Sequence, residues 1–380
     1  MSAVVVDEAA LDDPERLAAA DPGEMLRVVA GSGAQIRQAS ALSLEAGVDR
    51  LDGSPPSRTC ILTGIGSSAA AVGLIRAVVG DDAPVPLVTH PGGRFPRWVG
   101  PLDTVFAVSR SGTAVETLEA VEDAGRRGCG LVVVARPGSP LEELTRRFRG
   151  LFVPADKTPR HTRSSLWQLA VPILMAADRL GVASVPGEIL AMTADILDRV
   201  AESCRPSSES FVNPAKGLAL SLAGDLPVVW GSGDVGAFAA ERFVRQLSAN
   251  AKYPGVQARL RDVAHGGIAL LDGPFARRSE DDLFRDRVED EGEPMRLRLV
   301  LLRDDAEPED DRQRRAAAAE LADARGVPVH EVAAEGLHPL ERLGSLVGLT
   351  DFVSVYLAIA VGIDPTPTRA VLELKDRVRQ

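Results

Sequence analysis

Residues 103–117 read DTVFAVSRSGTAVET, an apolar run followed directly by serines and a helix-forming stretch. Four hydroxyls, those of Ser109, Ser111, Thr113 and Thr117, therefore gather where a strand ends and a helix begins. Backbone N–H groups at the start of a helix attract an anion, and a phosphate monoester needs many neutral donors in a small space. Capping of the helix accounts for one or two of these hydroxyls. The stretch therefore favours a phosphate-binding turn.

A similar stretch lies upstream, where residues 60–73 read CILTGIGSSAAAVG. Its GxGxxA pattern is typical of a dinucleotide-binding turn, but such a site also has an acid at the end of the next strand. Here that strand ends at His90, so the acid is missing. The same turn can bind a phosphate through its backbone and the hydroxyls of Ser67 and Ser68, or can be a tight turn with a serine N-cap. The turn alone leaves these alternatives open.

Strands and helices alternate through the first half of the chain. The apolar runs that predict strands lie at residues 58–63, 85–89, 103–108 and 131–135. The helical patterns lie at residues 67–79, from 113 onward and at 162–180. Alternation at this spacing is typical of βαβ units, which form a parallel sheet with helices on both faces.

The second half repeats this arrangement. Residues 228–240 read VVWGSGDVGAFAA, which is again a strand, a glycine-rich turn and a helix. The remaining elements predicted for this half are strands at 297–302 and 327–332, helices at 235–250, 312–325 and 340–361, and a last helix that opens at Pro365. We therefore expect two similar α/β halves, each a three-layer α/β/α structure with a mainly parallel sheet.

The predicted domain bounds follow from the repeat. Residues 1–20 are acidic and alanine-rich, and we expect them to form a frayed N-terminal arm. The first domain covers residues 21–204, residues 205–210 are a linker, and the second domain covers residues 211–380. Within the second domain, residues 280–293 hold eight acids and two arginines, which predicts an exposed insertion.

The composition excludes several classes of protein. With 380 residues, 45% of them hydrophobic and 26% charged, the chain is typical of a globular protein of two domains. No apolar run reaches the roughly 18 residues of a membrane span, and the acidic start does not resemble a signal peptide. The net charge of −11 and the lack of a basic stretch argue against nucleic-acid binding. The three scattered cysteines predict free thiols in a reducing cytoplasm, and we expect no metal site and no cofactor.

Lysine is rare in this chain. Only four of the 43 basic residues are lysines, namely Lys157, Lys216, Lys252 and Lys375. Since the chain otherwise uses arginine, a retained lysine indicates a place that requires a compact ammonium group. The alternative is that a lysine was retained by chance on the surface. The sequence alone does not distinguish this alternative from a required ammonium group.

The pattern S-x-S-G-x-T-x-E-T after a strand, here from Ser109 to Thr117, resembles that of sugar isomerase (SIS) domains, which bind phosphosugars. The upstream turn and the repeat in the second half agree with two SIS domains in tandem. More narrowly, the chain resembles the bifunctional phosphoglucose/phosphomannose isomerases over about residues 25–380. The resemblance implies two SIS-type halves and an enzyme that interconverts aldose and ketose phosphates.

The resemblance also implies roles for individual residues. Ser67 or Ser68, together with the four hydroxyls of the downstream turn, would hold the phosphate. Arg163 would stabilise an enediolate, His265 would open the sugar ring, and Lys375 would complete the site. The resemblance further implies a homodimer in which this histidine reaches into the site of the neighbouring chain.

One motif departs from the family. The family has an E-N-A-K stretch whose glutamate is the catalytic base, whereas residues 249–252 of this chain read ANAK. Isomerisation needs a base near C1 and C2 of the sugar, and alanine cannot supply one. Glu241 lies about 12 Å back along the predicted helix. Asp262, close to His265 in sequence, is the better substitute.

We therefore expect a cytoplasmic protein that binds a phosphosugar at the carboxyl ends of its strands, between its halves, and touches neither nucleic acid nor membrane. The predicted function is aldose–ketose isomerisation of hexose 6-phosphates through an enediol. The alternative is a non-catalytic phosphosugar-binding or regulatory protein that has lost the base. A third interpretation is a nucleotide-dependent enzyme that uses the GxGxxA turn, which would bind a nicotinamide cofactor.

Overall fold

The computed structural model describes residues 5–54, 56–156, 161–276 and 295–378. The chain divides into two compact units. The first-half unit contains residues 31–198 and 338–341, and the second-half unit contains residues 1–30, 199–337 and 342–380. The predicted acidic insertion at residues 280–293 lies outside the described residues.

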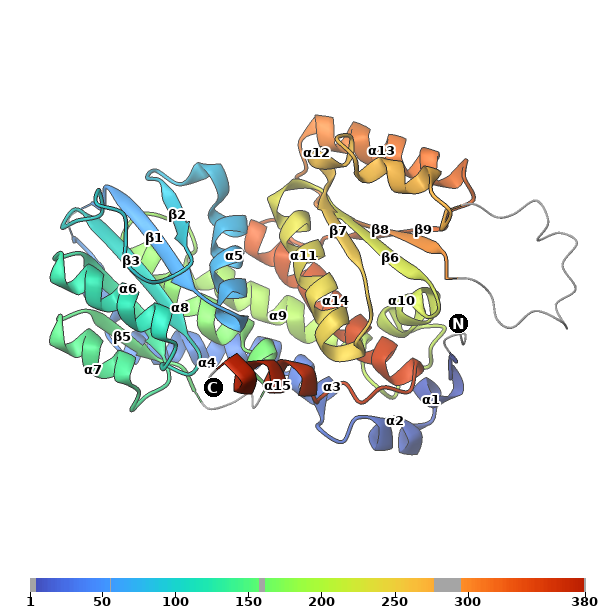
Figure 1. Ribbon diagram of the computed structural model, residues 1–380, viewed down its shortest axis with the longest axis horizontal. Coiled ribbons are helices and arrows are strands. Elements are labelled where there is room, and N and C mark those ends of the chain that lie inside the picture. Colours follow the sequence, from blue (N-terminus) through green and yellow to red (C-terminus); the bar gives the residue numbers. More distant parts are fainter. Residues whose placement is uncertain (1–4, 55, 157–160, 277–294, 379–380) are drawn as a thin grey trace, which may run out of the picture. The chain divides into compact units, whose positions relative to one another are not determined.

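The first-half unit is built on a five-stranded parallel sheet (Figure 1). Its strands are β1 (Thr59–Gly64), β2 (Leu87–His90), β3 (Asp103–Ser109), β4 (Gly130–Ala135) and β5 (Leu151–Pro154). Across the sheet they follow the order β2-β1-β3-β4-β5, and each neighbouring pair is parallel. The central strands β3 and β4 are buried along almost their whole length, which explains their continuous apolar sequence.

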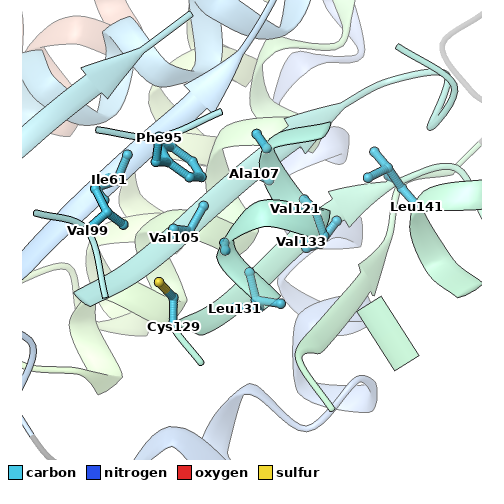
Figure 2. Packing of buried hydrophobic residues seen from close by; sticks show 13 residues of the cluster. Ile61, Phe95, Val99, Val105, Ala107, Val121, Cys129, Leu131, Val133 and Leu141 are labelled. Carbon is cyan, nitrogen blue, oxygen red and sulfur yellow. The ribbon is translucent and has the colours of Figure 1, made fainter. Parts of the chain in front are cut away.

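Helices cover both faces of this sheet (Figure 1). They are α6 (Val115–Arg126) and α7 (Pro140–Arg147) on one face, and α4 (Ser32–Glu45), α5 (Ser67–Val79) and α8 (Leu166–Arg179) on the other. Figure 2 shows the core beneath α6 and α7, where Val105 and Ala107 of β3 lie beside Leu131 and Val133 of β4 and pack against Val121. Alternate strand residues point to this face because the side-chain period of a strand is two.

The second-half unit is built on a four-stranded parallel sheet in the order β7-β6-β8-β9. Its strands are β6 (Leu226–Gly231), β7 (Val256–Arg259), β8 (Leu297–Arg303) and β9 (Val329–Ala333). The helices that follow these strands or flank the sheet are α10 (Pro214–Leu222), α11 (Gly233–Gln246), α12 (Leu260–Val263), α13 (Glu309–Asp323), α14 (Pro339–Ala360) and α15 (Arg369–Val378). The helix α9 (Gly187–Ser203) spans the boundary between the two units in sequence.

The helix α14 is the most apolar of the long helices. Among the described residues it is the one helix long and apolar enough, by length and composition, to cross a bilayer, but 94% of its apolar window is buried inside the protein. It also carries buried polar residues, since Asp351 binds the guanidinium of Arg242 at 2.6 Å and Ser354 accepts a hydrogen bond from Asn250 at 2.8 Å. These features are those of the core helix of a globular unit.

The start of the chain is ordered, and the expectation of a frayed arm is wrong for the residues that the structure describes. Residues 9–12 form α1, residues 14–20 form α2 and residues 25–30 form α3. Leu11 and Met25 are fully buried, which ties these short helices to the second-half unit. Ordering these helices costs chain entropy, and the burial of their apolar side chains offsets that cost.

Lys216 of α10 is wholly buried and holds this start in place. Its Nζ donates to the carbonyl oxygens of Leu11, Pro206 and Ser208 at 2.5, 2.9 and 2.6 Å, and lies 3.1 Å from a carboxylate oxygen of Asp12. A compact ammonium group fits this cage of oxygens, whereas a planar guanidinium needs acceptors in a fork. The scarcity of lysine therefore did indicate a special environment here.

The predicted elements of both halves are confirmed, with differences at the edges. Each sheet has one more strand than predicted, because β5 and β7 are only four residues long, too short for a pattern to identify them. The helix α6 starts at Val115, two residues after the predicted start, and α15 starts at Arg369 rather than at Pro365. The predicted fold class, two three-layer α/β halves with parallel sheets, is confirmed.

Candidate functional site

The order of the strands in the first sheet indicates where a ligand would bind. From β1 the chain moves outward to β2, and it then returns to β3 on the other side of β1 and continues outward to β4 and β5. Parallel sheets of this order bind ligands at the carboxyl ends of the two strands where the direction reverses. Gly64 at the end of β1 pairs with Val108 of β3. The two hydroxyl-rich turns predicted from the sequence therefore lie side by side.

The turn after β1 leaves both of its serine hydroxyls available. Gly66 is the N-cap of α5 with a φ of 59°, and no side chain caps this helix. The alternative of a tight turn with a serine N-cap is therefore wrong. Ser67 is half-buried. Ser68 is buried, and its Oγ accepts a hydrogen bond from the backbone N–H of Arg110 at 3.2 Å, so its own proton remains available for donation.

The turn after β3 is closed by its own serines. The Oγ of Ser109 accepts a hydrogen bond from the N–H of Gly112 at 3.2 Å, and Gly112 has a φ of 70°. The Oγ of Ser111 accepts from the backbone N–H and the hydroxyl of Thr113 at 3.3 and 3.1 Å. The N-cap of α6 is Ala114, and no side chain caps this helix either. Ser111 and Thr113 are exposed, so an anion has direct access to them.

Thr117 occupies a different position from the other hydroxyls. It is fully buried on the first turn of α6, and its Oγ1 has no hydrogen-bond partner within the described chain. The same is true of Thr63 at the end of β1 and of Ser139 at the start of α7. Buried hydroxyls without a partner cost about 1–3 kcal/mol each. Their position around one pair of turns indicates an environment built to receive polar groups.

Sequence reasoning missed Ser139. A Cβ atom on Gly112 would lie 2.2 Å from its Oγ, so this hydroxyl lies directly against the turn after β3. Only a glycine fits at position 112, both for its left-handed backbone and for this close approach. The signal available in the sequence was a serine before a proline after the strand at 131–135, which reads as the start of another helix at the same edge.

One position of the family pattern is not matched in this chain. Counted from Ser109, the first threonine of S-x-S-G-x-T-x-E-T falls on Ala114, and Thr113 stands one position earlier. The structure places the hydroxyl of Thr113 within 3.1 Å of Ser111. The turn therefore retains an exposed hydroxyl beside Ser111 although the pattern position itself has none.

Arg163 lies in the same unit, on a short 3₁₀ helix (Thr162–Ser164) between β5 and α8. Its side chain is half-buried. Two residues later Ser165 is fully buried and accepts a hydrogen bond from Nε of Arg110 at 3.0 Å. The segment that carries Arg163 is thus joined to the turn after β3.

The remaining catalytic candidates lie in the second-half unit. The helix α11 runs without a break into a π-helical turn (Leu247–Ala251), where Ala249 is half-buried. Such turns are frequent at functional sites. The turn ends at Lys252, which has a φ of 54°, and whose Nζ donates to the carbonyl oxygens of Asn250 at 2.9 Å and Asp364 at 2.8 Å. The side chain of Lys252 therefore stabilises the backbone next to Ala249, the position at which the family has its base.

His265 follows the short helix α12 and is exposed. Its backbone N–H donates to the carbonyl oxygen of Asp262 at 3.0 Å, and Asp262 is exposed as well. Gly266 has a φ of 147°, which side chains rarely tolerate. The other acid considered, Glu241, pairs with Arg245 at 2.7 Å on the surface of α11.

Lys375 lies on α15, a helix with no buried residue. Its neighbours on the helix include the exposed apolar side chains of Val371, Leu372, Leu374 and Val378. Among the described residues there is no group of three His, Cys, Asp or Glu side chains that could hold a metal ion.

The sequence comparisons show a likeness to sugar-phosphate isomerases. Residues 211–378 match the family model of the bacterial phospho-glucose isomerase C-terminal SIS domain. A bifunctional phosphoglucose/phosphomannose isomerase of Caldicellulosiruptor bescii is 27% identical over 322 residues, which cover 84% of this chain and 89% of that protein. One from Aquifex aeolicus is 26% identical over 277 residues, which cover 73% of this chain and 76% of that protein.

Solved structures agree on the fold. A hypothetical protein from Thermus thermophilus superposes with a TM-score of 0.70 at 16% identity, over 98% of this chain and 94% of that chain. Tagatose-6-phosphate ketose/aldose isomerase from Escherichia coli superposes with a TM-score of 0.66 at 16% identity, over 90% and 95% of the two chains. Fold and turns together define a protein of two SIS-type halves. The chain resembles the bifunctional phosphoglucose/phosphomannose isomerase family, as its motifs predict and its sequence relatives confirm.

Proposed function

We propose that this protein is an aldose–ketose isomerase of hexose 6-phosphates, which interconverts glucose or mannose 6-phosphate with fructose 6-phosphate through an enediol. The observation that carries the proposal is the meeting of two hydroxyl-lined turns at the reversal between β1 and β3. The names of the two sequence relatives, both bifunctional phosphoglucose/phosphomannose isomerases, support the substrate class.

The phosphate is the part of the substrate that this geometry serves first. Ser67 and Ser111 donate hydroxyl protons to its oxygens, Thr113 does so once its bond to Ser111 is exchanged for one to the phosphate, and the starts of α5 and α6 add backbone N–H groups. Ser68 donates its available proton in the same direction. Ser109 and Thr117 are buried, and Ser109 closes the turn by accepting the N–H of Gly112. Neutral donors suffice for a dianion when several converge.

The chemistry at C1 and C2 requires three kinds of group. His265 takes the proton of the C1 hydroxyl and returns a proton to the ring oxygen, which breaks the bond between C1 and that oxygen. A base then removes the proton on C2 of the aldose and delivers it to C1 of the enediol, which yields the ketose. Arg163 stabilises the negative charge of the enediolate, and Lys375 completes the site.

The base is the group that the family position does not provide, because residue 249 is alanine. We propose Asp262, which is three residues from His265 and joined to it by a backbone hydrogen bond. Glu241 is less suited because its carboxylate is paired with Arg245. Both sequence relatives are named as isomerases, which does not favour the alternative of a non-catalytic sensor.

A nucleotide-dependent enzyme is also not supported. His90 ends β2 in the place of the acid that binds a ribose, and its Nδ1 accepts the backbone N–H of Gly92 at 3.2 Å. Burial lowers the pKa of His90, which favours its neutral form.

The test is conversion of fructose 6-phosphate to glucose and mannose 6-phosphates by the wild type, Asp262→Asn and Ala249→Glu, beside a calorimetric measurement of substrate binding. We expect turnover by the wild type and a loss of about 10²- to 10⁴-fold in Asp262→Asn, the contribution of a positioned base. A fast Asp262→Asn variant would exclude Asp262. Binding without turnover in the wild type, with turnover in Ala249→Glu, would support the sensor.

We further propose that the protein works in the cytoplasm as a homodimer whose histidine reaches into the neighbouring site. The cytoplasm agrees with three free and buried cysteines, whose pKa burial raises to about 11, so that they stay protonated. The exposed apolar side chains of α15 suit a subunit contact. Light scattering that gives the mass of a monomer at micromolar concentration would contradict the dimer.

A further inference from the structure

Arg110 lies in the middle of the turn after β3, between Ser109 and Ser111. Its backbone N–H donates to the Oγ of Ser68 at 3.2 Å. The two phosphate-binding turns are therefore joined through the backbone of this residue, and its side chain is not needed for that contact. The guanidinium can therefore act elsewhere.

The guanidinium of Arg110 reaches the segment between β5 and α8. Its Nε donates to the Oγ of Ser165 at 3.0 Å, and its Nη1 donates to the carbonyl oxygen of Asp156. Asp156 follows β5, and Ser165 directly follows the short helix that carries Arg163 and precedes α8. Arg163 lies between them, two residues before Ser165.

The side chain of Arg110 lies among both charges and hydrogen-bond acceptors. The side chain is half-buried, and burial lowers its pKa, as does the charge of Arg136, while the Asp156 carboxylate raises it. Arg136 is near because it follows Ala135, the register partner of Ser109. The carboxylate of Asp156 also accepts a hydrogen bond from Gln38 at 2.6 Å. The two bonds leave from different nitrogens of a rigid plane, Nε and Nη1, whereas all the donors of a lysine lie on one atom, so a lysine cannot reproduce this geometry.

We propose that Arg110 is a positioning residue that sets the place of Arg163 relative to the bound phosphate. This inference rests on the proposed function, in which Arg163 faces the enediolate. The backbone of Arg110 joins the two phosphate-binding turns, whereas its side chain binds beside Arg163. A change of the side chain therefore affects catalysis and phosphate affinity differently. The side chain governs stabilisation of the reacting carbons and leaves the affinity for phosphate alone.

The test compares Arg110→Lys with the matched control Arg136→Lys, an exposed arginine at the same edge. We expect kcat for fructose 6-phosphate to fall at least 10-fold in Arg110→Lys, while the inhibition constant of inorganic phosphate changes less than 3-fold. Arg136→Lys keeps kcat within 2-fold. Ser165→Ala, which removes one acceptor, lowers kcat in the same direction and adds little to Arg110→Lys in the double variant.

A binding measurement tests the proposal even if the wild type binds its substrate but does not turn it over. 5-Phospho-D-arabinonate carries a carboxylate where the enediolate would form, and we expect Arg110→Lys to lose at least 10-fold in affinity for it relative to inorganic phosphate. Equal losses for both ligands would make Arg110 a phosphate ligand and overturn the proposal. No loss for either ligand would also overturn it. Failure of the wild type to bind inorganic phosphate or any hexose 6-phosphate would instead overturn the proposed function.

Discussion

The two halves carry the same turn, a glycine-rich link between a strand and a helix, but they fill it with different chemistry. In the first half the turn after β1 carries the half-buried Ser67, and the turn after β3 carries Ser111 and Thr113, which are both exposed. In the second half the turn after β6 is closed by acids. The N–H of Gly233 donates to a carboxylate oxygen of Asp311 at 3.1 Å, which occupies the start of α11.

The loop after β8 completes the closure of the second turn. The backbone N–H of Asp304 donates to the Oγ of Ser232 at 2.9 Å, and the carboxylate of Asp304 binds Nε of Arg342 at 2.5 Å. A phosphate there would have to displace the carboxylate of Asp311 from the start of α11. Repetition of a fold therefore does not repeat its site, because the ligand at a helix start is chosen by the side chains around it.

The largest expected effect tests the packing of the second turn. A Cβ on Gly231 would lie 2.0 Å from the carbonyl oxygen of Gly236, and backbone cannot yield as a side chain can. We expect Gly231→Ala to lower the free energy of unfolding of the second-half unit by about 3 kcal/mol. In the first half a Cβ from the matched change Gly64→Ala would lie 3.1 Å from the carbonyl oxygen of Val108, so we expect about 1 kcal/mol.

Urea unfolding followed by tryptophan fluorescence measures both variants, with buried Trp230 reporting on the second-half unit. Equal midpoints for Gly231→Ala and the wild type would show that the strand and the helix are not in tight contact.

The second prediction concerns a carboxylate introduced into the turn after β3, like the one that lies at the turn after β6. Ser111→Asp removes an exposed donor and places a carboxylate where we propose that the phosphate binds. We expect the affinity for fructose 6-phosphate to fall about 100-fold, since a charge-assisted hydrogen bond is replaced by repulsion. Calorimetry at pH 7 measures it, and thermal unfolding serves as the control for folding. An unchanged dissociation constant would remove Ser111 from the site.

The third prediction removes donors without adding charge. Ser111→Ala combined with Thr113→Ala should weaken binding of fructose 6-phosphate by roughly 1–3 kcal/mol, the scale of hydrogen bonds to a charged group. Ser232→Ala is the matched control in the second turn and should leave the affinity within 2-fold. Equal losses in both variants would mean that the two turns do not differ in function.

The elements that the sequence predicted best are those with one dominant physical cause. The buried strands β3 and β4 are continuous apolar runs because helices cover both faces of the sheet. The short strands β5 and β7 were missed, since four residues at the edge of a sheet carry little periodicity. Pairing with a neighbouring strand, which the local sequence does not encode, makes them strands.

The candidate site shows the same division. The hydroxyls of residues 109–117 were visible in the sequence, but their sorting was not. Thr117 is buried and Ser111 exposed because α6 packs its inner face on the sheet, against residues far away along the chain. Arg110 was not singled out, since its acceptors at Asp156 and Ser165 are 46 and 55 positions away.

The sequence by itself determined the alternation of strands and helices, the glycine-rich turns and the hydroxyl chemistry, because each depends on residues within one element. Tertiary structure decided which turn is open to an anion and which is closed by Asp304 and Asp311. It also decided that Lys216 is caged and Lys375 exposed. These outcomes depend on which distant groups meet, and charges and hydrogen bonds act over a few ångströms in space, whatever the separation along the chain.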